Sequence, residues 1–348
     1  MIAWESHYTS NLVVAVLLAG GAGTAWALRH DPRARALVWA FMHRRLAVAA
    51  TVLFGLFALI AVLDSIAWRD RINPNEMNEA RAYRPWSVID RLFPKDFDER
   101  VHSAPMARTT FYGHAALRYP GGHLLGTNII GRDTLHQTLK GFRPAMIIGV
   151  FTTLLVLPLA MLAGVIAGYF GRRVDDVIQY IYSTLASIPS ILLLIALILV
   201  MGRGTFQVCV ALGVTSWVGL CRLLRAETLK LREMEYVQAA LAQGLGHGRI
   251  LTRHIVPNLL HIVLISCVLR FSGLVLNESI LSYFGIGLEG SFGAMIVLAR
   301  DELARKPVIW WNLAAASTAL FLLVLTANII GDALRDLLDP RLRSGAGA

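Results

Sequence analysis

The stretch that decides the fold is Ala145–Phe170, AMIIGVFTTLLVLPLAMLAGVIAGYF, which contains no charged side chain. At 1.5 Å per residue, a helix of this length extends about 39 Å, and the hydrocarbon core of a bilayer is about 30 Å thick. Apolar residues occupy every side of this helix, whereas a soluble surface helix keeps one polar face. The stretch therefore predicts a membrane-spanning helix.

Further apolar blocks of similar character lie on both sides of this stretch. They are Leu12–Leu28, Leu46–Trp68, Val177–Met201, Phe206–Cys221, Leu259–Phe284 and Val308–Ile330. The chain has 348 residues, of which 56% are hydrophobic and 16% charged, against about 25% charged in soluble domains. This composition excludes a disordered chain, a disulfide scaffold and an ordinary cytosolic enzyme. We expect an all-α integral membrane protein with seven transmembrane helices.

The distribution of basic residues predicts how the chain is oriented. Arginines are concentrated in Arg29–Arg45, and Lys and Arg outnumber acids in the loop Arg222–His254. Short cytoplasmic loops carry such an excess, so we expect both segments in the cytoplasm, the N-terminus outside and the C-terminus inside. The first block is read as a retained span because its arginines follow it, whereas a cleaved signal peptide has them in front. The net charge of +10 thus reflects topology, and no nucleic-acid partner is expected.

The connection between the fifth and sixth blocks is unusual. Met234–Gln243 consists of good helix formers and ends at Gly244, and Pro257 suits the first turn of the next span. The short helix carries three small residues, Ala239, Ala240 and Ala242. Two interpretations stay open on these residues alone. The helix is either a knob that inserts into the groove of a partner or an amphipathic connector on the membrane surface.

This loop and several other motifs resemble one known family. The pattern Gln238-Ala-Ala-x-x-x-Gly244 followed by Ile255-Val-Pro257 is similar to the EAA loop of ABC-importer permeases. Further motifs resemble its dipeptide/oligopeptide/nickel branch, specifically the second, C-type permease. They are His123–Asp133, Gly168–Asp175, Ile188–Ser190, Asn277–Gly285 and Gly331–Arg341. The chain departs from the pattern at Gln238, where Glu is usual, and at Asn128, where Asp is usual. It also adds an N-terminal span to a six-helix core, together with a longer outer segment.

The resemblance implies a coupling role for the loop, which in this family docks on a cytoplasmic ATPase. The residues assigned to that contact are Glu235, Gln238, Ala239, Ala240, Gly244 and Pro257. The chain lacks a Gly-x-x-x-x-Gly-Lys-Ser/Thr phosphate loop. We therefore expect no cofactor in this chain, with ATP and Mg²⁺ bound by the partner subunits.

The resemblance also implies the assembly and its location. We expect a permease subunit of an ATP-driven importer of peptides or peptide-like solutes in the bacterial inner membrane, not an enzyme. Its partners would be a homologous permease, two ATPases, an extracytoplasmic binding protein and membrane lipid. The alternative is a self-sufficient ion-coupled carrier, which predicts relays of buried ionisable residues and inverted repeats. The sequence offers only Glu278 well inside a block and no repeat.

The predicted organisation has four parts. Residues 1–45 hold the extra span and a basic cytoplasmic linker, and residues 46–143 hold the first core helix and a long outer segment. Residues 144–343 form the permease core, with the coupling loop at 232–258, and 344–348 form a tail. Pairs such as Asn73-Pro74 and Phe93-Pro94 mark turns in the outer segment. We expect short helices or extended pieces there.

Ionisable residues inside a span are candidates for a translocation path, because each costs about 2.5–3.5 kcal/mol on insertion scales. Arg270 and Asn277 are seven positions apart and share a helix face. Arg270 would either bind a substrate carboxylate or pair with an acid on another helix or subunit. Glu278 is assigned either to the same path or to the outer mouth of that path. We favour the second assignment.

Proline and cysteine residues inside the blocks have simple interpretations. Pro158 and Pro189 each remove a backbone hydrogen bond and allow a bend, so they predict tolerated kinks or hinges. The three cysteines, Cys209, Cys221 and Cys267, show no Cys-x-x-Cys spacing. The sequence therefore predicts neither a zinc site nor a redox pair.

Overall fold

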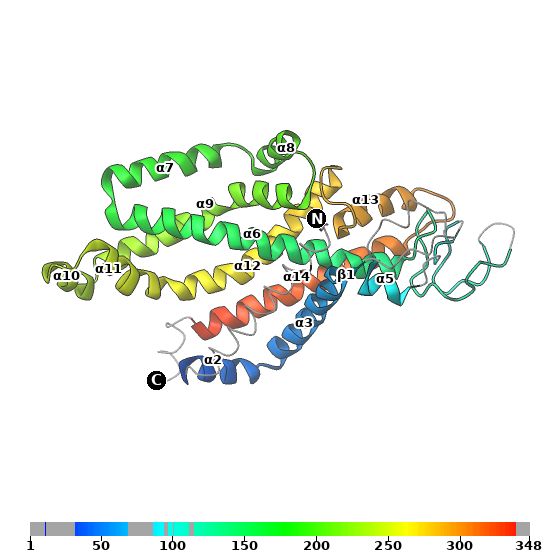
Figure 1. The fold of residues 1–348 in the computed structure, drawn as a ribbon, viewed down its shortest axis with the longest axis horizontal. Helices are drawn as coiled ribbons and strands as arrows, with labels where there is room; N and C mark the ends of the chain where they lie inside the picture. The colour runs from blue at the N-terminus through cyan, green and yellow to red at the C-terminus, as the bar shows by residue number, and fades with distance from the viewer. Residues whose placement is uncertain are drawn as a thin grey trace, which may run out of the picture. The chain divides into compact units, whose positions relative to one another are not determined.

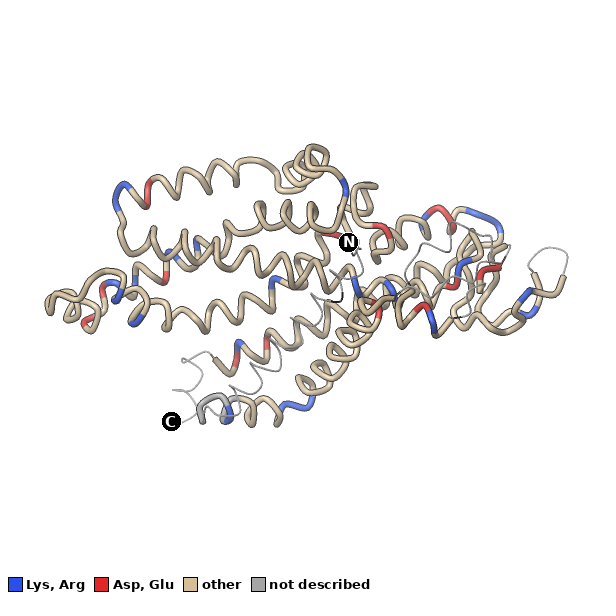
Figure 2. The backbone as a smooth tube through the Cα atoms, viewed as in Figure 1, with Lys and Arg blue, Asp and Glu red and all other residues tan. Residues whose placement is uncertain are grey.

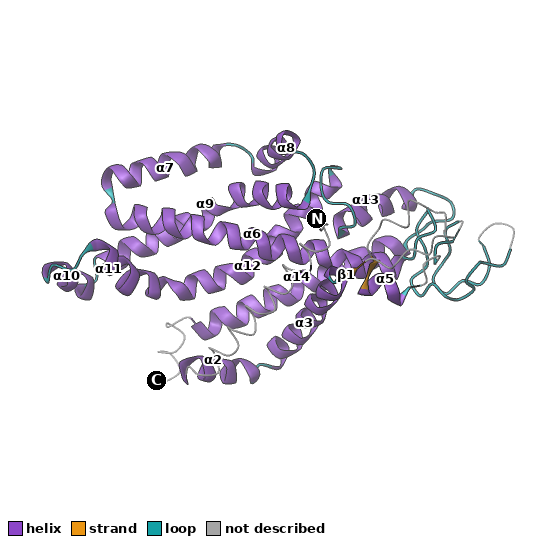
Figure 3. Cartoon of the chain, in the orientation of Figure 1, coloured by secondary structure: helices purple, strands orange, loops and turns teal. Residues whose placement is uncertain are grey.

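The computed structural model describes residues 11, 32–68, 86–93, 97–99, 101–110 and 115–338. Helices dominate the described part of the chain (Figure 3). The first predicted block, Leu12–Leu28, lies outside the described residues. The helices are α2 (Pro32–Met42), α3 (Arg45–Ser65), α5 (Val88–Leu92), α6 (Thr134–Phe170), α7 (Arg172–Ser187), α8 (Ser190–Met201), α9 (Thr205–Arg232), α10 (Glu235–Ala242), α11 (His247–Ile250), the π-helical turn η1 (Leu251–Ile255), α12 (Val256–Tyr283), α13 (Phe292–Leu303) and α14 (Trp311–Leu338).

Five helices in the described ranges are long and apolar enough to cross a membrane. They are α3, α6, α9, the continuous helix His247–Tyr283 and α14. Each contains one of the predicted blocks or overlaps all but a few of its residues, so those five predictions are confirmed by length and composition. Charged residues gather near helix ends and in connections, leaving long uncharged stretches between them (Figure 2).

The block Val177–Met201 was expected as one span in which Pro189 permits a bend, and it counts as one span only when its two helices are taken together. It forms α7 and α8, which meet at 90°. Ile188 is extended, with φ −90° and ψ 131°, as residues before proline prefer, and Pro189 has no N–H to continue the ladder of α7. The bend expected from Pro189 is therefore present, although it is a break rather than a kink. Pro158, in contrast, lies inside α6 without interrupting it.

By their contacts, the residues form two compact units. One comprises residues 1–146 and 289–326, and the other comprises 147–288 and 327–348. The four parts predicted from the sequence follow the order of spans and loops along the chain, whereas these units follow contacts. The four parts therefore stay predictions.

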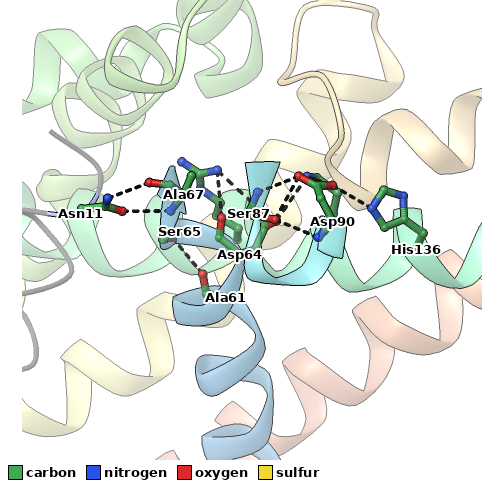
Figure 4. A network of polar contacts seen from close by, with 10 residues as sticks. Asn11, Ala61, Asp64, Ser65, Ala67, Ser87, Asp90 and His136 are labelled. Carbon is green, nitrogen blue, oxygen red and sulfur yellow. Dashed lines mark hydrogen bonds and ion pairs between the residues drawn. The ribbon is translucent and has the colours of Figure 1, made fainter. Parts of the chain in front are cut away.

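In the first unit, the chain after α3 forms short extended and helical pieces, as expected for the outer segment. Strand β1 (Ala67–Trp68) pairs antiparallel with β2 (Trp86–Ser87), and α5 follows directly. The side chain of Asn11 pairs with the backbone of Ala67, donating to its carbonyl at 2.8 Å and accepting from its N–H at 3.1 Å (Figure 4). Residue 11 therefore lies beside the C-terminal end of α3.

A buried polar network joins α3, α5 and α6 in this unit (Figure 4). Ser87 caps α5 by accepting from the Asp90 N–H, and Asp90 accepts from the Ser87 N–H in return. Ser87 Oγ also lies 2.7 Å from a carboxylate oxygen of Asp64. Lys140 Nζ lies 2.6 Å from Asp90 and 3.3 Å from Asp64, and His136 Nε2 lies 2.9 Å from Asp90. The two carboxylates thus share one lysine.

This network predicts a pH-dependent stability. Burial alone would raise the pKa of Asp90, but hydrogen bonds from His136, Lys140 and the Ser87 backbone outweigh it and hold the pKa well below its ordinary value of 3.8. The stabilisation is therefore present above that value and is lost as the pH falls further. We expect Asp90→Asn to lower the free energy of unfolding by about 2 kcal/mol at pH 7. In detergent-solubilised protein, the difference in unfolding between variant and wild type should shrink below about pH 3.8. A difference that stays constant down to pH 3 would contradict this.

In the second unit, α6 and α9 approach closely at two glycines. A Cβ atom at Gly164 would lie 2.6 Å from the Cys221 carbonyl oxygen, and one at Gly168 would lie 2.7 Å from that of Arg225. Glycines four residues apart allow helix backbones to pack this closely in membranes. Around this contact, Leu220, Leu224, Ile255 and Leu259 form a buried cluster. Because the cluster also includes Val237, Ala240 and Ile250, it anchors the connection between α9 and α12.

Candidate functional site: the loop between α9 and α12

Helix α10 stands in the connection between α9 and α12, at the end of the unit where α11 also lies (Figure 1). Gly244 ends it with φ +77°. The Gly244 N–H donates to the Leu241 carbonyl, and the Leu245 N–H donates to the Ala240 carbonyl. These two bonds form a Schellman motif, for which glycine is favoured because the left-handed conformation strains other residues. The predicted stop at Gly244 is confirmed.

The two faces of α10 differ in burial. Val237 and Ala240 are buried in the core cluster, and Leu241 packs against it. The opposite face is exposed and carries Glu235, Gln238, Ala239 and Ala242. We call this set the outer face of α10.

The sequence placed Ala239, Ala240 and Ala242 on one small-residue face, but the structure separates them. Ala240 belongs to the buried face, because adjacent residues on a helix point about 100° apart. Of the residues assigned to a partner contact, Glu235, Gln238 and Ala239 remain available to a partner, whereas Ala240 holds the helix to the core.

Gln238 has a second contact that depends on its amide. Its Nε2 donates to the Arg232 carbonyl at 2.8 Å, near the end of α9. A carboxylate cannot donate such a bond, so glutamine at this position links α10 to α9 in a way that the usual glutamate could not.

Further polar contacts fix the loop. Tyr169, near the end of α6, shares a hydrogen bond of 2.8 Å with His247 of α11. Its backbone carbonyl accepts from Arg232 at 3.3 Å. On the other side of the loop, the Asn258 amide donates to the Tyr236 hydroxyl at 3.2 Å. Contacts to α6, α9 and α12 therefore hold α10 and α11 in place.

Pro257 lies at the start of α12, as expected. The preceding turn η1 is π-helical, and the Val256 N–H donates to the Leu251 carbonyl five residues back. A proline ring in a helix crowds the carbonyl four residues before it. The wider π turn relieves that crowding, so α11, η1 and α12 form one continuous helix from His247 to Tyr283.

An ion pair that the sequence did not reveal joins α7 and α9. Arg225 donates to both carboxylate oxygens of Asp175, with Nη2 2.6 Å from Oδ2, and Gln179 donates to the same carboxylate at 3.0 Å. Asp175 and Arg225 are 50 positions apart, so no sequence spacing indicated that they form a pair. The close approach at Gly164 and Gly168 was also missed, although its four-residue spacing was visible in the sequence.

The translocation candidates lie on α12 but have different surroundings. Arg270 Nη1 donates to the backbone carbonyl of Ser216 on α9 at 2.7 Å, so its contact among the described residues is a carbonyl rather than an acid. Asn277 is partly exposed on the same face. Glu278 is 2% exposed and accepts from Ser282 Oγ at 2.6 Å and from the Leu288 N–H at 3.3 Å. Glu278 thus holds the turn after α12.

Taken together, these features define a class of protein: a multi-span helical membrane protein with a short helix held by several contacts between two spans. A family model described as "Binding-protein-dependent transport system inner membrane component" matches residues 160–344. The chain belongs to this family of inner-membrane permeases, the membrane subunits of ABC importers. The resemblance predicted from the sequence is therefore confirmed, and the ion-coupled carrier is not supported.

Three relatives illustrate the match. The oligopeptide transport system permease protein OppC of Haemophilus influenzae is 34% identical over 259 residues, covering 74% of this chain and 79% of that protein. The dipeptide transport system permease protein DppC of Bacillus subtilis is 34% identical over 225 residues, covering 64% and 69%. The glutathione transport system permease protein GsiD of Pectobacterium atrosepticum is 34% identical over 225 residues, covering 64% and 74%.

Proposed function

We propose that this chain forms half of the translocation path of an ATP-driven importer of peptides or peptide-like solutes. Its partners would be a homologous permease, two ATPases and a substrate-binding protein outside the membrane. The peptide assignment rests on relatives named for oligopeptide, dipeptide and glutathione transport. These three solutes share amide bonds and free carboxylates.

The observation that carries the mechanism is the division of α10 into two faces. The inner face is fixed to the spans through Val237 and Ala240, whereas the outer face presents Glu235, Gln238, Ala239 and Ala242. A surface with two small residues, on a helix fixed to the spans by its other face, suits a contact that must transmit movement. The outer face would dock on an ATPase, and closure of the ATPase pair on ATP would move α10 together with α9 and α12. Because ATP would bind one state better than the other, it would shift access between the two membrane sides.

The proposed topology has seven spans, with the N-terminus outside and the loop of α10 in the cytoplasm. The basic segments 29–45 and 222–254 support this orientation by the positive-inside rule. The bonds between Asn11 and Ala67 also support it. Residue 11 precedes the first block and Ala67 follows α3, so an antiparallel pair of spans would bring these two residues to the same surface.

The experiment that tests the function is reconstitution of the complete importer. The tagged chain would be co-expressed with the permease, ATPase and binding-protein subunits encoded beside it, purified in mild detergent and placed in liposomes. We expect the ATPases to co-purify, and uptake of labelled peptides to require both ATP and the binding protein. Uptake by this chain alone, driven by an ion gradient, would overturn the proposal.

A further inference from the structure

Arg270 is a cation deep in a membrane span. It lies eleven positions after Leu259, the start of the apolar block, which is about 16 Å along the helix axis. Its contact Ser216 lies ten positions after Phe206, the start of the facing block, or about 15 Å. Both residues are therefore near the middle of a hydrocarbon layer about 30 Å thick.

The surroundings of Arg270 leave most of its hydrogen-bonding capacity unused. A guanidinium has five N–H donors, and Nη1 donates to the Ser216 carbonyl at 2.7 Å. No acid in the described ranges pairs with it, and the side chain is only partly buried. A Cβ at Gly219 of α9, three residues after Ser216, would lie 3.4 Å from Nη2, so the guanidinium lies beside the α9 backbone at this glycine.

The acid closest in sequence is engaged elsewhere. Glu278 lies eight positions further along α12 and is buried against Ser282 and the Leu288 N–H. The face that Arg270 shares with Ser266 and Asn277, in contrast, carries polar groups that are partly exposed. A positive charge in the membrane without a counter-ion is costly. An anion that arrives with the solute would offset this cost.

We propose that Arg270 binds the carboxylate of the transported solute during its passage, which makes Arg270 a specificity-determining residue. This inference rests on the proposed function, because it takes the solute to be peptide-like. A guanidinium matches a carboxylate with two parallel hydrogen bonds, and the Ser216 carbonyl, which holds Nη1, would orient the remaining N–H groups. The solute class is therefore one with a free carboxylate, and a C-terminal amide would lose the interaction.

The test compares two forms of one peptide, a free acid and its C-terminal amide, in the reconstituted importer. The variants are Arg270→Gln, which removes the charge, and Arg270→Lys, which keeps it. We expect Arg270→Gln to reduce uptake of the acid by about tenfold and uptake of the amide by less than roughly twofold, with Arg270→Lys intermediate for the acid. The amide serves as an internal control for folding and assembly.

A second measurement is needed if the binding protein rejects the amide. The labelled acid would then be titrated onto the ATP-analogue-bound complex in nanodiscs without the binding protein. We expect about tenfold weaker binding in Arg270→Gln than in wild type. Equal losses for acid and amide, or unchanged binding of the acid, would assign Arg270 to a link between α12 and α9 or to an acid of another subunit, and would overturn the inference. If the wild-type importer takes up no peptide at all, the proposed function fails instead.

Discussion

Ala239→Trp on the outer face of α10 is expected to reduce transport by more than about tenfold while the chain still inserts and folds. Ala239 is exposed, so an indole at this position would not displace other atoms of the chain. In the assembled importer, the same indole would occupy space that the docked ATPase fills. Overpacking of this kind costs about 1–3 kcal/mol or more. We expect solute uptake and co-purification of the ATPases to fall by more than about tenfold.

The matched control is Ala239→Ser, which keeps the position small and should leave uptake within roughly twofold of wild type. The thermal stability of the isolated subunit in detergent should be the same for both variants, since neither touches the buried face. If Ala239→Trp folds and transports normally, the outer face is not a docking surface.

Gly168→Val is expected to separate α6 from α9 and to destabilise the unit that carries the coupling loop. A Cβ at Gly168 would lie 2.7 Å from the Arg225 carbonyl and equally close to Thr228 Cβ, and a backbone carbonyl cannot rotate away. We expect a loss of about 2 kcal/mol in the free energy of unfolding. The movement would also pull Arg225 from Asp175, so uptake should fall in parallel.

Gly273→Val is the control for this substitution. Gly273 is also inside a long helix, α12, but a Cβ there has nothing within 4 Å. Both variants introduce the same β-branched residue into a helix. The difference between their unfolding curves in detergent therefore measures the cost of the steric clash between α6 and α9. Equal curves would show that α6 and α9 do not depend on this close approach.

The sequence predicted the features that local physics determines. Most of the long uncharged stretches became long helices, Gly244 ended α10, and Pro257 lies in the first turn of α12, because hydropathy and backbone preferences act over a few residues. The bend at Pro189 was indicated by the residue itself, but its size was not. A proline permits a range of geometries, and packing selects among them.

The features that were missed depend on contacts between distant residues. The division of α10 into an inner and an outer face was missed because the alanines were grouped by size and not by their angle around the helix. The acceptor for Arg270 is 54 positions away, and the carboxylate network of Asp64 and Asp90 joins three segments. No short sequence window contains such pairs.

The most direct test of the account is photo-crosslinking from α10 in the assembled importer. A photoreactive amino acid would be placed at Ala242 on the outer face, and at Ala186 of α7 as an exposed control position. The account predicts a crosslink to the ATPase from Ala242, changing in yield when ATP binds, and none from Ala186. No ATPase crosslink from Ala242 in a complex that still imports peptide would contradict it.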